Sequence, residues 1–343
     1  MTSVSYRMSG SGNWQNLLPD EFARRLYADI YPRGTTISKE TDRLFRSWQR
    51  AGIADIRNHR VIPRGPIMTE GDLTILQAWF QNLSDVMCRT VSERLHDYRD
   101  LAEKLTGGLP QEKQTTENIL TILICARTLD SWMFSMLRRD VIGPYPSRGD
   151  AGDFFFWGYA FSEGPQRIFG FTTYGGRAKR HLHMIRSHSL DREAIKAVLN
   201  RLEIWDVLYP YLFENISGNR TVLTDRLMTD LPPKAVDLLK DIGLLDAGSP
   251  PRLAIPLWTG HDRDVIAGIC REVSQKVHHH FMAVMDELER LHASCSFADC
   301  SRPDCLCMIF HLAYAYAADK LVAEEIIPDF PQKAGGEWGV WID

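Results

Sequence analysis

The sequence lacks every complete catalytic signature that we sought. It contains no GxxxxGK[ST], GxGxxG, HExxH or GxSxG motif, which argues against the nucleotide-binding, metalloprotease and hydrolase classes that these motifs mark. Its carboxylates are scattered, and spacing singles out no pair of them. Cys88 and Cys125 have no neighbouring histidine or aspartate and stand in apolar helical patterns, so we expect them in the core. We therefore assign no catalytic residue from the sequence, and whether the protein is an enzyme stays open.

A basic excess, a secretion signal and a long apolar run are also missing. The 343 residues carry a formal net charge of −4, so any affinity for nucleic acid must come from local patches. Residues 1–15 contain no apolar core, and the strongest apolar run, Ile119–Ala126, is too short to cross a bilayer. We therefore expect a cytoplasmic protein without a membrane partner.

An internal repeat is the most informative feature of the sequence. Gly65–Asp72 and Ile255–Asp262 share a proline, a threonine and an aspartate at a constant shift of 190 residues. The two threonines, Thr69 and Thr259, are typical helix N-caps, and apolar residues recur every four positions after each of them. The length of the chain also favours two domains. We predict a first repeat at 1–146, a connector at 147–190 and a second repeat at 191–343.

The connector contains the strongest strand signal of the chain. Asp153–Phe161 and Gln166–Tyr174 are rich in aromatic and β-branched residues, and Ser-Glu-Gly-Pro separates them. We predict that these two segments pair as a central aromatic β-hairpin. A further short strand, Glu337–Ile342, is expected after the second repeat.

Thr221–Thr259 carries a local pattern of two short helices followed by a wing. The expected helices are Thr224–Leu231 and Lys234–Leu245, and Ser249–Pro256 is the expected wing. This pattern resembles the winged-helix superfamily of bacterial transcription regulators, and a weaker form of it recurs at Ser38–Thr69. The resemblance implies that the second helix of such a unit enters the DNA major groove while the wing touches phosphates. The expected fold class is therefore mainly α (α+β), with two winged-helix-like units, each extended by long helices, and the central hairpin.

Basic residues concentrate in the first of these units and in the connector. Clustered arginine and lysine release counterions when they neutralise phosphates, so such clusters predict nucleic-acid contact. The helix and wing of the first unit and the connector together offer Arg43, Arg46, Arg50, Arg57, Arg60, Arg64, Arg177, Lys179 and Arg180. For the stretch 177–186, an ordinary solvated helix face is the competing interpretation.

Four of the seven cysteines lie within thirteen residues, and the chain shows no disulfide framework. These are Cys295, Cys300, Cys305 and Cys307, interrupted by a turn-forming Arg-Pro-Asp. Clustered thiolates in a reducing compartment are typical of a tetrahedral zinc site, and an iron–sulfur cluster takes the same ligands. We predict that they hold Zn²⁺, with an iron–sulfur cluster as the alternative. A redox-switching thiol set and unligated buried cysteines are the remaining interpretations.

Taken together, these features favour a DNA-binding transcriptional regulator with a metal- or cluster-binding cysteine site. The alternative is a metal-containing enzyme, or a ligand- or peptide-binding accessory protein, with a pocket between the aromatic hairpin and the helices. Either function leaves room for a small-molecule ligand.

Overall fold

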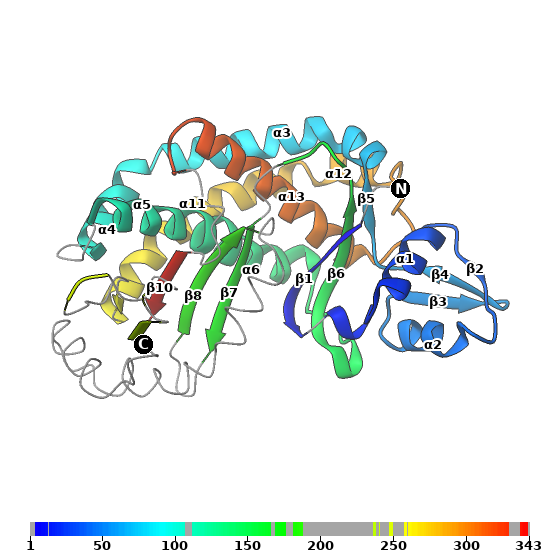
Figure 1. Ribbon diagram of the computed structural model, residues 1–343. Coiled ribbons are helices and arrows are strands. Elements are labelled where there is room, and N and C mark those ends of the chain that lie inside the picture. The colour runs from blue at the N-terminus through cyan, green and yellow to red at the C-terminus, as the bar shows by residue number, and fades with distance from the viewer. Residues whose placement is uncertain are drawn as a thin grey trace. The chain divides into compact units, whose positions relative to one another are not determined.

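In the computed structural model, the described residues are 4–12, 14–106, 112–165, 169–175, 181–187, 236–237, 240, 247–249, 257–258, 260–328 and 337–341. Within them, helices account for most of the regular structure and small sheets for the rest (Figure 1). The expected fold class is therefore confirmed at the level of a mainly α or α+β protein. The second predicted winged helix, at Thr221–Thr259, lies almost entirely outside the described residues.

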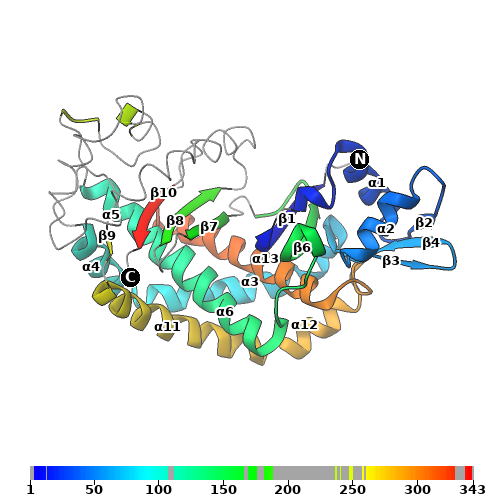
Figure 2. The same ribbon diagram turned by 90° about the horizontal axis from the view of Figure 1, so that it is seen from below.

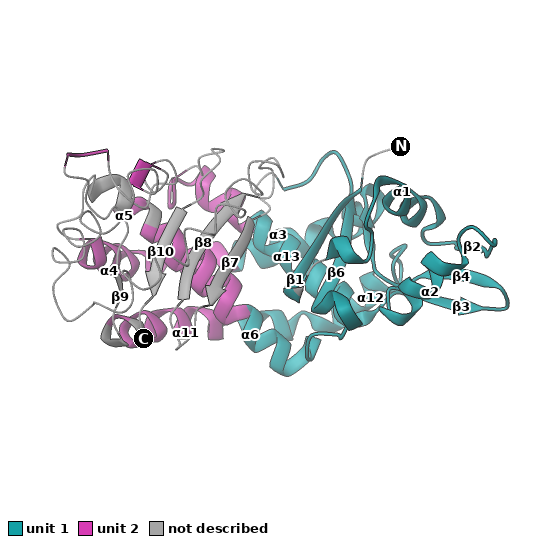
Figure 3. Ribbon diagram, turned by 60° about the horizontal axis from the view of Figure 1, so that its bottom comes forward, with its two compact units in different colours: residues 1–86, 134–166, 278–316 teal, residues 87–133, 167–277, 317–343 magenta. Residues whose placement is uncertain are grey.

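The chain divides into two compact units, coloured separately in Figure 3. Unit 1 comprises residues 1–86, 134–166 and 278–316, and unit 2 comprises 87–133, 167–277 and 317–343. Each unit therefore draws on both halves of the sequence. The boundaries predicted at 146 and 190 follow the sequence repeat rather than these units, and they stay a prediction.

Unit 1 contains two small sheets and the helices that pack on them. Its N-terminal elements are β1 (Ser5–Gly12), η1 (Trp14–Asn16), α1 (Glu21–Ile30), β2 (Thr35–Thr36), α2 (Asp42–Arg50), β3 (Ala54–Arg57), β4 (Arg60–Pro63) and β5 (Ile67–Thr69). The long helix α3 (Glu70–Ser92) begins in this unit. Later stretches add α6 (Met133–Leu137), the π-helix η3 (Arg138–Ile142), η4 (Gly149–Ala151), β6 (Gly152–Ala160), α12 (Met285–His292) and the start of α13 (Arg302–Ala323).

Unit 2 is built from helices and one mixed sheet. Its described elements include α4 (Leu95–Thr106), α5 (Glu112–Thr121), the π-helix η2 (Ile122–Trp132), β7 (Phe169–Gly175), β8 (His181–Ser187), β9 (Leu257–Trp258), most of α11 (Gly260–Ala283) and β10 (Glu337–Trp341). The strand expected at the end of the second repeat is thus present as β10.

Three strands from each half of the sequence are arranged in the same order, and the sheet of unit 2 adds β7 beside β8. In unit 1 the order is β1-β6-β5, with β6 antiparallel to β1 and parallel to β5. In unit 2 the order β8-β10-β9 has β10 antiparallel to β8 and parallel to β9. In each case the short strand precedes a long helix, α3 or α11, and the central strand comes later in the chain. This shared order is what an internal repeat of the sequence predicts.

The predicted central hairpin is wrong, although both of its strands exist. The first, β6, lies between β1 and β5, whereas the second, β7, pairs with β8 in the sheet of unit 2. Phe154, Phe155 and Phe156 are all fully buried, so β6 is covered on both faces and is bordered by a strand on each side. Strand propensity is a local property, but the partner of a strand depends on tertiary packing.

Buried aromatic side chains hold the N-terminal elements of unit 1 together. The Tyr27 hydroxyl donates to the carbonyl oxygen of Ile53 at 2.8 Å and accepts from the Gly65 backbone N–H at 2.9 Å. The Trp48 indole N–H donates to the carbonyl oxygen of Leu17 at 2.9 Å, and the Tyr27 and Trp48 rings pack edge to face. Because both polar groups are satisfied, the rings are buried without an unpaired donor.

The N-cap predicted at Thr69 is confirmed at the level of hydrogen bonds. At the start of α3, the Asp72 N–H donates to the Thr69 hydroxyl oxygen, while the Asp72 carboxylate accepts from the backbone N–H and the hydroxyl of Thr69. After α2, Gly52 takes a φ of +67°, which is the left-handed conformation that ends many helices.

Two helical stretches among the described residues are long and apolar enough to span a bilayer. They are Ile119–Ile142 and Arg302–Ala323, and 67% and 72% of their apolar windows are buried inside the protein. The core helices of globular proteins have the same composition.

Candidate nucleic-acid interface

Helix α2 separates its side chains into a buried and a basic face. Phe45 and Trp48 are fully buried and fix the helix on the core of unit 1. Arg43, Arg46 and Arg50 are exposed and recur at a spacing of three and four residues, which places them along one side of the helix. The three arginines therefore share an accessible face, and their contact with nucleic acid stays a prediction.

The strands β3 and β4 form a tight hairpin directly after α2, and with β2 they make a sheet of order β2-β4-β3. Asn58 and His59 form its two-residue turn with φ values of +49° and +59°. Left-handed values at both central positions define a type I′ turn, which matches the twist of the flanking strands. Figures 1 and 2 both show the hairpin extending beside α1 and α2.

The hairpin turn places two arginines directly opposite each other. Arg57 and Arg60 are cross-strand partners, and both are exposed, as are Asn58 and His59 between them. Like charges at such a position are destabilising, because their β-carbons lie only ~5 Å apart. The Asp55 carboxylate lies 2.9 Å from the Arg57 guanidinium and offsets part of this repulsion. The tip of the hairpin is therefore a compact positive site that an anion would stabilise.

The segment 14–64, which contains α1, α2 and the β3–β4 hairpin, is basic, although the chain as a whole carries a net negative charge. Residues 14–64 contain ten lysines and arginines against six aspartates and glutamates. Asp42 pairs with Arg46 at 2.8 Å on the surface of α2. Arg43 and Arg50 form no ion pair with any residue that the structure describes. Surface pairs of this kind are weak, so the paired arginines can exchange their partner for a phosphate.

Arg64 is placed differently from the other predicted contacts. Its side chain is only 23% exposed, and its guanidinium lies 2.7 Å from the Asp55 carboxylate. It also donates to the carbonyl oxygen of Asp299, while the backbone N–H of Ser301 donates to the Arg64 carbonyl at 2.9 Å. Arg64 therefore connects the β3–β4 hairpin to the cysteine-containing segment Cys295–Cys307 of unit 1. Of the predicted basic residues, Arg177, Lys179 and Arg180 lie outside the described part of the chain.

Arg148, which no sequence pattern singles out, stabilises the C-terminal end of α2. Arg148 is 4% exposed, and its guanidinium donates to the carbonyl oxygens of Ala51 and Gly52 at 3.1 and 3.3 Å. It also donates to the carbonyl oxygen of Phe154 and to both carboxylate oxygens of Asp304. A cation at a helix C-terminus satisfies carbonyls that have no partner inside the helix. No motif surrounds Arg148 in the sequence, so its role comes from the fold alone.

The four predicted metal ligands do not meet at one point in the structure. The Cys295 thiol lies 3.5 Å from the carbonyl oxygen of Leu291, and the Cys300 sulfur lies 3.7 Å from the Tyr31 hydroxyl. Cys305 lies 3.6 Å from the Phe297 carbonyl oxygen. Two residues further along α13, Cys307 contacts the imidazole Nδ1 of His311 at 3.6 Å. Two residues of a helix turn the chain by about 200°, so Cys305 and Cys307 point to opposite sides of α13.

Three of the cysteines nevertheless lie within electrostatic range of one another. Burial raises the pKa of Cys305 well above its ordinary value, and Cys300, Asp304 and Cys295 raise it further. Burial likewise raises the pKa of Cys295 to about 12 and that of Cys300 to about 11. These thiols are therefore protonated at neutral pH unless a metal displaces the proton.

No group of three or more histidine, cysteine or acidic side chains among the described residues is arranged to hold a metal ion. The sequence also suggested a turn at Arg302-Pro-Asp304, but helix α13 begins at Arg302. Proline is favoured in the first turn of a helix, where its missing N–H has no partner to lose. The four-cysteine site stays a prediction, and its arrangement here would require Cys307 to move or to be replaced by another ligand.

Comparisons with family models, with curated proteins and with solved structures gave no match to this chain.

Proposed function

We propose that residues 14–64 form a winged-helix-like module that binds duplex DNA, as part of a transcriptional regulator. The order of elements supports this proposal. Helix α2 is followed at once by the β3–β4 hairpin, and strand β2, which precedes α2, completes the sheet β2-β4-β3. A hairpin directly after a helix with an exposed basic face is the arrangement that the winged-helix resemblance implies.

The observation that carries the proposal is the pair of arginines at the hairpin tip. Arg57 and Arg60 stand directly opposite each other, and the Asp55 carboxylate and the Arg33 carbonyl oxygen offset only part of their like charge. A phosphate backbone supplies the negative charge that this pair lacks, and the face with Arg43, Arg46 and Arg50 supplies further contacts. Arg64 is excluded from the contact set, because Asp55 and Asp299 occupy its guanidinium.

The test measures binding of the full chain to a labelled random-sequence duplex by fluorescence anisotropy over a series of salt concentrations. The variants are Arg57→Ala with Arg60→Ala, and Arg43→Ala with Arg50→Ala. Each lost phosphate contact is expected to reduce the slope of log K against log salt by about 0.9. Non-specific contacts are sequence-independent, so affinity should fall on every duplex tested.

Arg25→Ala is the matched control for these variants. Arg25 is as exposed as the candidate residues, but it lies on α1 and pairs with Glu21 at 2.8 Å. Its removal is expected to leave the salt slope unchanged. Wild-type protein that binds no duplex at low salt, or double variants with the wild-type slope, would contradict the proposal. Binding of single-stranded RNA alone would assign the site to another class of partner.

The alternative pocket, between the aromatic segment and the helices, gains no support from the side chains of β6. Phe156 stacks on Tyr6 with ring centroids 5.7 Å apart, and Phe155 packs against Phe134 and Tyr145. These rings fill the core of unit 1.

A further inference from the structure

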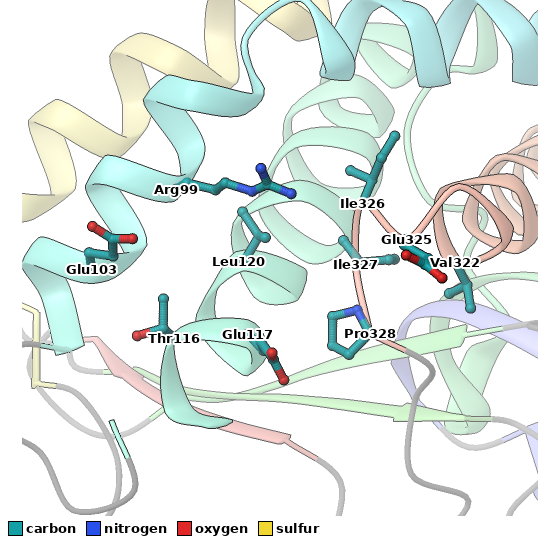
Figure 4. A pocket seen from close by; sticks show the side chains of 10 residues that line it. All are labelled: Arg99, Glu103, Thr116, Glu117, Leu120, Val322, Glu325, Ile326, Ile327 and Pro328. Atoms are coloured by element: carbon teal, nitrogen blue, oxygen red, sulfur yellow. The ribbon is translucent and has the colours of Figure 1, made fainter. Parts of the chain in front are cut away.

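A cavity of about 970 Å³ lies in unit 2, where α4 and α5 face the end of α13 and the residues that follow it (Figure 4). Its apolar lining consists of Leu120, Val322, Ile326, Ile327 and Pro328. Small-molecule sites typically enclose ~300–1,000 Å³ and combine such an apolar lining with a few charged groups. The cavity is therefore large enough for an organic ligand rather than for a lone ion.

Thr116 and four charged side chains complete the lining, and three of these four are acidic. Arg99 and Glu103 stand four residues apart on α4, and Figure 4 shows the Arg99 side chain extending toward Leu120 and Ile326 rather than toward Glu103. Glu117 on α5 and Glu325 after α13 add two further carboxylates, and Arg99 is the one basic side chain among the described lining residues. Figure 4 shows Glu117 and Glu325 on either side of Pro328, one on each wall. Three carboxylates and one guanidinium thus accompany the apolar surface.

The backbone at Glu325 adds a second feature to this wall. Its φ is +55°, in the left-handed region where glycine is the usual residue after a helix. A glutamate there costs about 1 kcal/mol relative to glycine. Glu325 therefore holds its carboxylate at this wall in a backbone conformation that is unfavourable for any residue other than glycine.

We infer that this cavity binds an organic cation with an apolar body, such as an alkylammonium compound. The positive group lies between Glu117 and Glu325, and the apolar part covers Leu120, Ile326 and Ile327. The excess of carboxylates over guanidinium groups in the lining makes the local potential negative, which concentrates cations at its mouth. This site is separate from the basic module of unit 1 and does not depend on DNA binding.

The experiment is a calorimetric titration of the full chain with octyltrimethylammonium below its micelle concentration. Octyl sulfate and octyl glucoside carry the same alkyl chain with a negative and an uncharged head group. We expect saturable binding of the cation, at least about tenfold tighter than either comparison compound, and weaker binding at high salt. Glu117→Gln and Glu325→Gln should each weaken it about three- to tenfold.

Two further variants separate a ligand contact from a structural effect. Glu324→Gln removes an exposed carboxylate next to the cavity that does not line it, and binding should stay at the wild-type level. Glu325→Gly relieves the left-handed backbone, so the melting temperature should stay equal or rise while affinity for the cation falls. Equal affinity for all three compounds, tighter binding of octyl sulfate, or full affinity in both Glu→Gln variants would overturn the inference.

Discussion

The Arg148 guanidinium holds both carboxylate oxygens of Asp304, at 2.8 and 2.7 Å, in the interior of unit 1. Asp304 is fully buried at the start of α13, and its carboxylate also accepts from the backbone N–H of Phe156 at 3.0 Å. Arg148 also donates to the carbonyl oxygens of Ala51 and Gly52, directly after α2. This ion pair therefore connects α2, strand β6 and the start of α13. A buried pair is stable only when its remaining hydrogen bonds are also made, as they are here.

Removing one partner of this pair should destabilise unit 1 strongly. Asp304→Asn leaves the Arg148 charge buried without its counterion, and we expect a loss of about 3–5 kcal/mol in the free energy of unfolding. Chemical denaturation measures this loss. Arg302→Ala is the control: it breaks an exposed pair with Glu289 near the same helix end and should cost less than about 1 kcal/mol. Similar losses of unfolding free energy in the two variants would show that the buried pair contributes no more to stability than the exposed pair.

The hairpin turn offers a test that separates stability from binding. His59 has a φ of +59°, so His59→Gly removes the side-chain strain of the left-handed conformation. We expect the melting temperature to stay equal or rise, by the equivalent of about 0.5–1 kcal/mol at most. DNA affinity should not increase, because the arginines on both sides of the turn are unchanged. A clear drop in the melting temperature would contradict the type I′ assignment.

The protein should lose stability as the pH falls from about 6.5 to about 4. Burial lowers the pKa of His311 to about 4, whereas an unfolded histidine titrates near its ordinary value of 6.5. Between these two values the unfolded state binds a proton that the folded state does not, so acid favours unfolding. Burial also lowers the pKa of His278 and of His292, which adds to the effect in the same direction.

Denaturation curves at several pH values measure this dependence. His311→Gln should flatten the curve by at most about 3 kcal/mol over the window. The exposed residue His279 provides the control, since His279→Gln should leave the curve as in the wild type. A steeper loss of stability in acid for His311→Gln than for the wild type would contradict the lowered pKa of His311.

Metal content tests the prediction that the clustered cysteines bind a metal ion, and it can also show whether Cys307 is one of the ligands. Cys307 lies on the opposite side of α13 from Cys305 and contacts His311. If the anaerobically purified protein contains zinc or iron, Cys305→Ser should lose it and Cys307→Ser should retain it. Elemental analysis of both variants decides the matter. A metal-free wild type would remove the site, and equal loss in both variants would restore the four-cysteine arrangement.

Local features of the sequence predicted the elements well where the signal lies within a few residues. The cap at Thr69 and the aromatic strand β6 both depend on neighbours along the chain. The shift of 190 residues aligned the segments that form β5 with α3 and β9 with α11, and these segments occupy matching places in the strand orders β1-β6-β5 and β8-β10-β9. Such patterns are legible because caps, turns and strand propensity are decided by short-range sterics and hydrogen bonds.

The tertiary structure alone decided which of these elements meet. Strand β1 has the sequence SYRMSGSG, which carries no strong strand signal, yet it pairs with β6 over eight residues. Arg148 and Asp304 are 156 residues apart, and Cys305 and Cys307 are separated by their place on a helix rather than gathered in a loop. The sequence by itself determined where many segments are helical, capped, basic or apolar, although it suggested a turn where α13 begins. Partners of buried charges and strands are chosen by packing between distant segments, where desolvation and shape outweigh local preference.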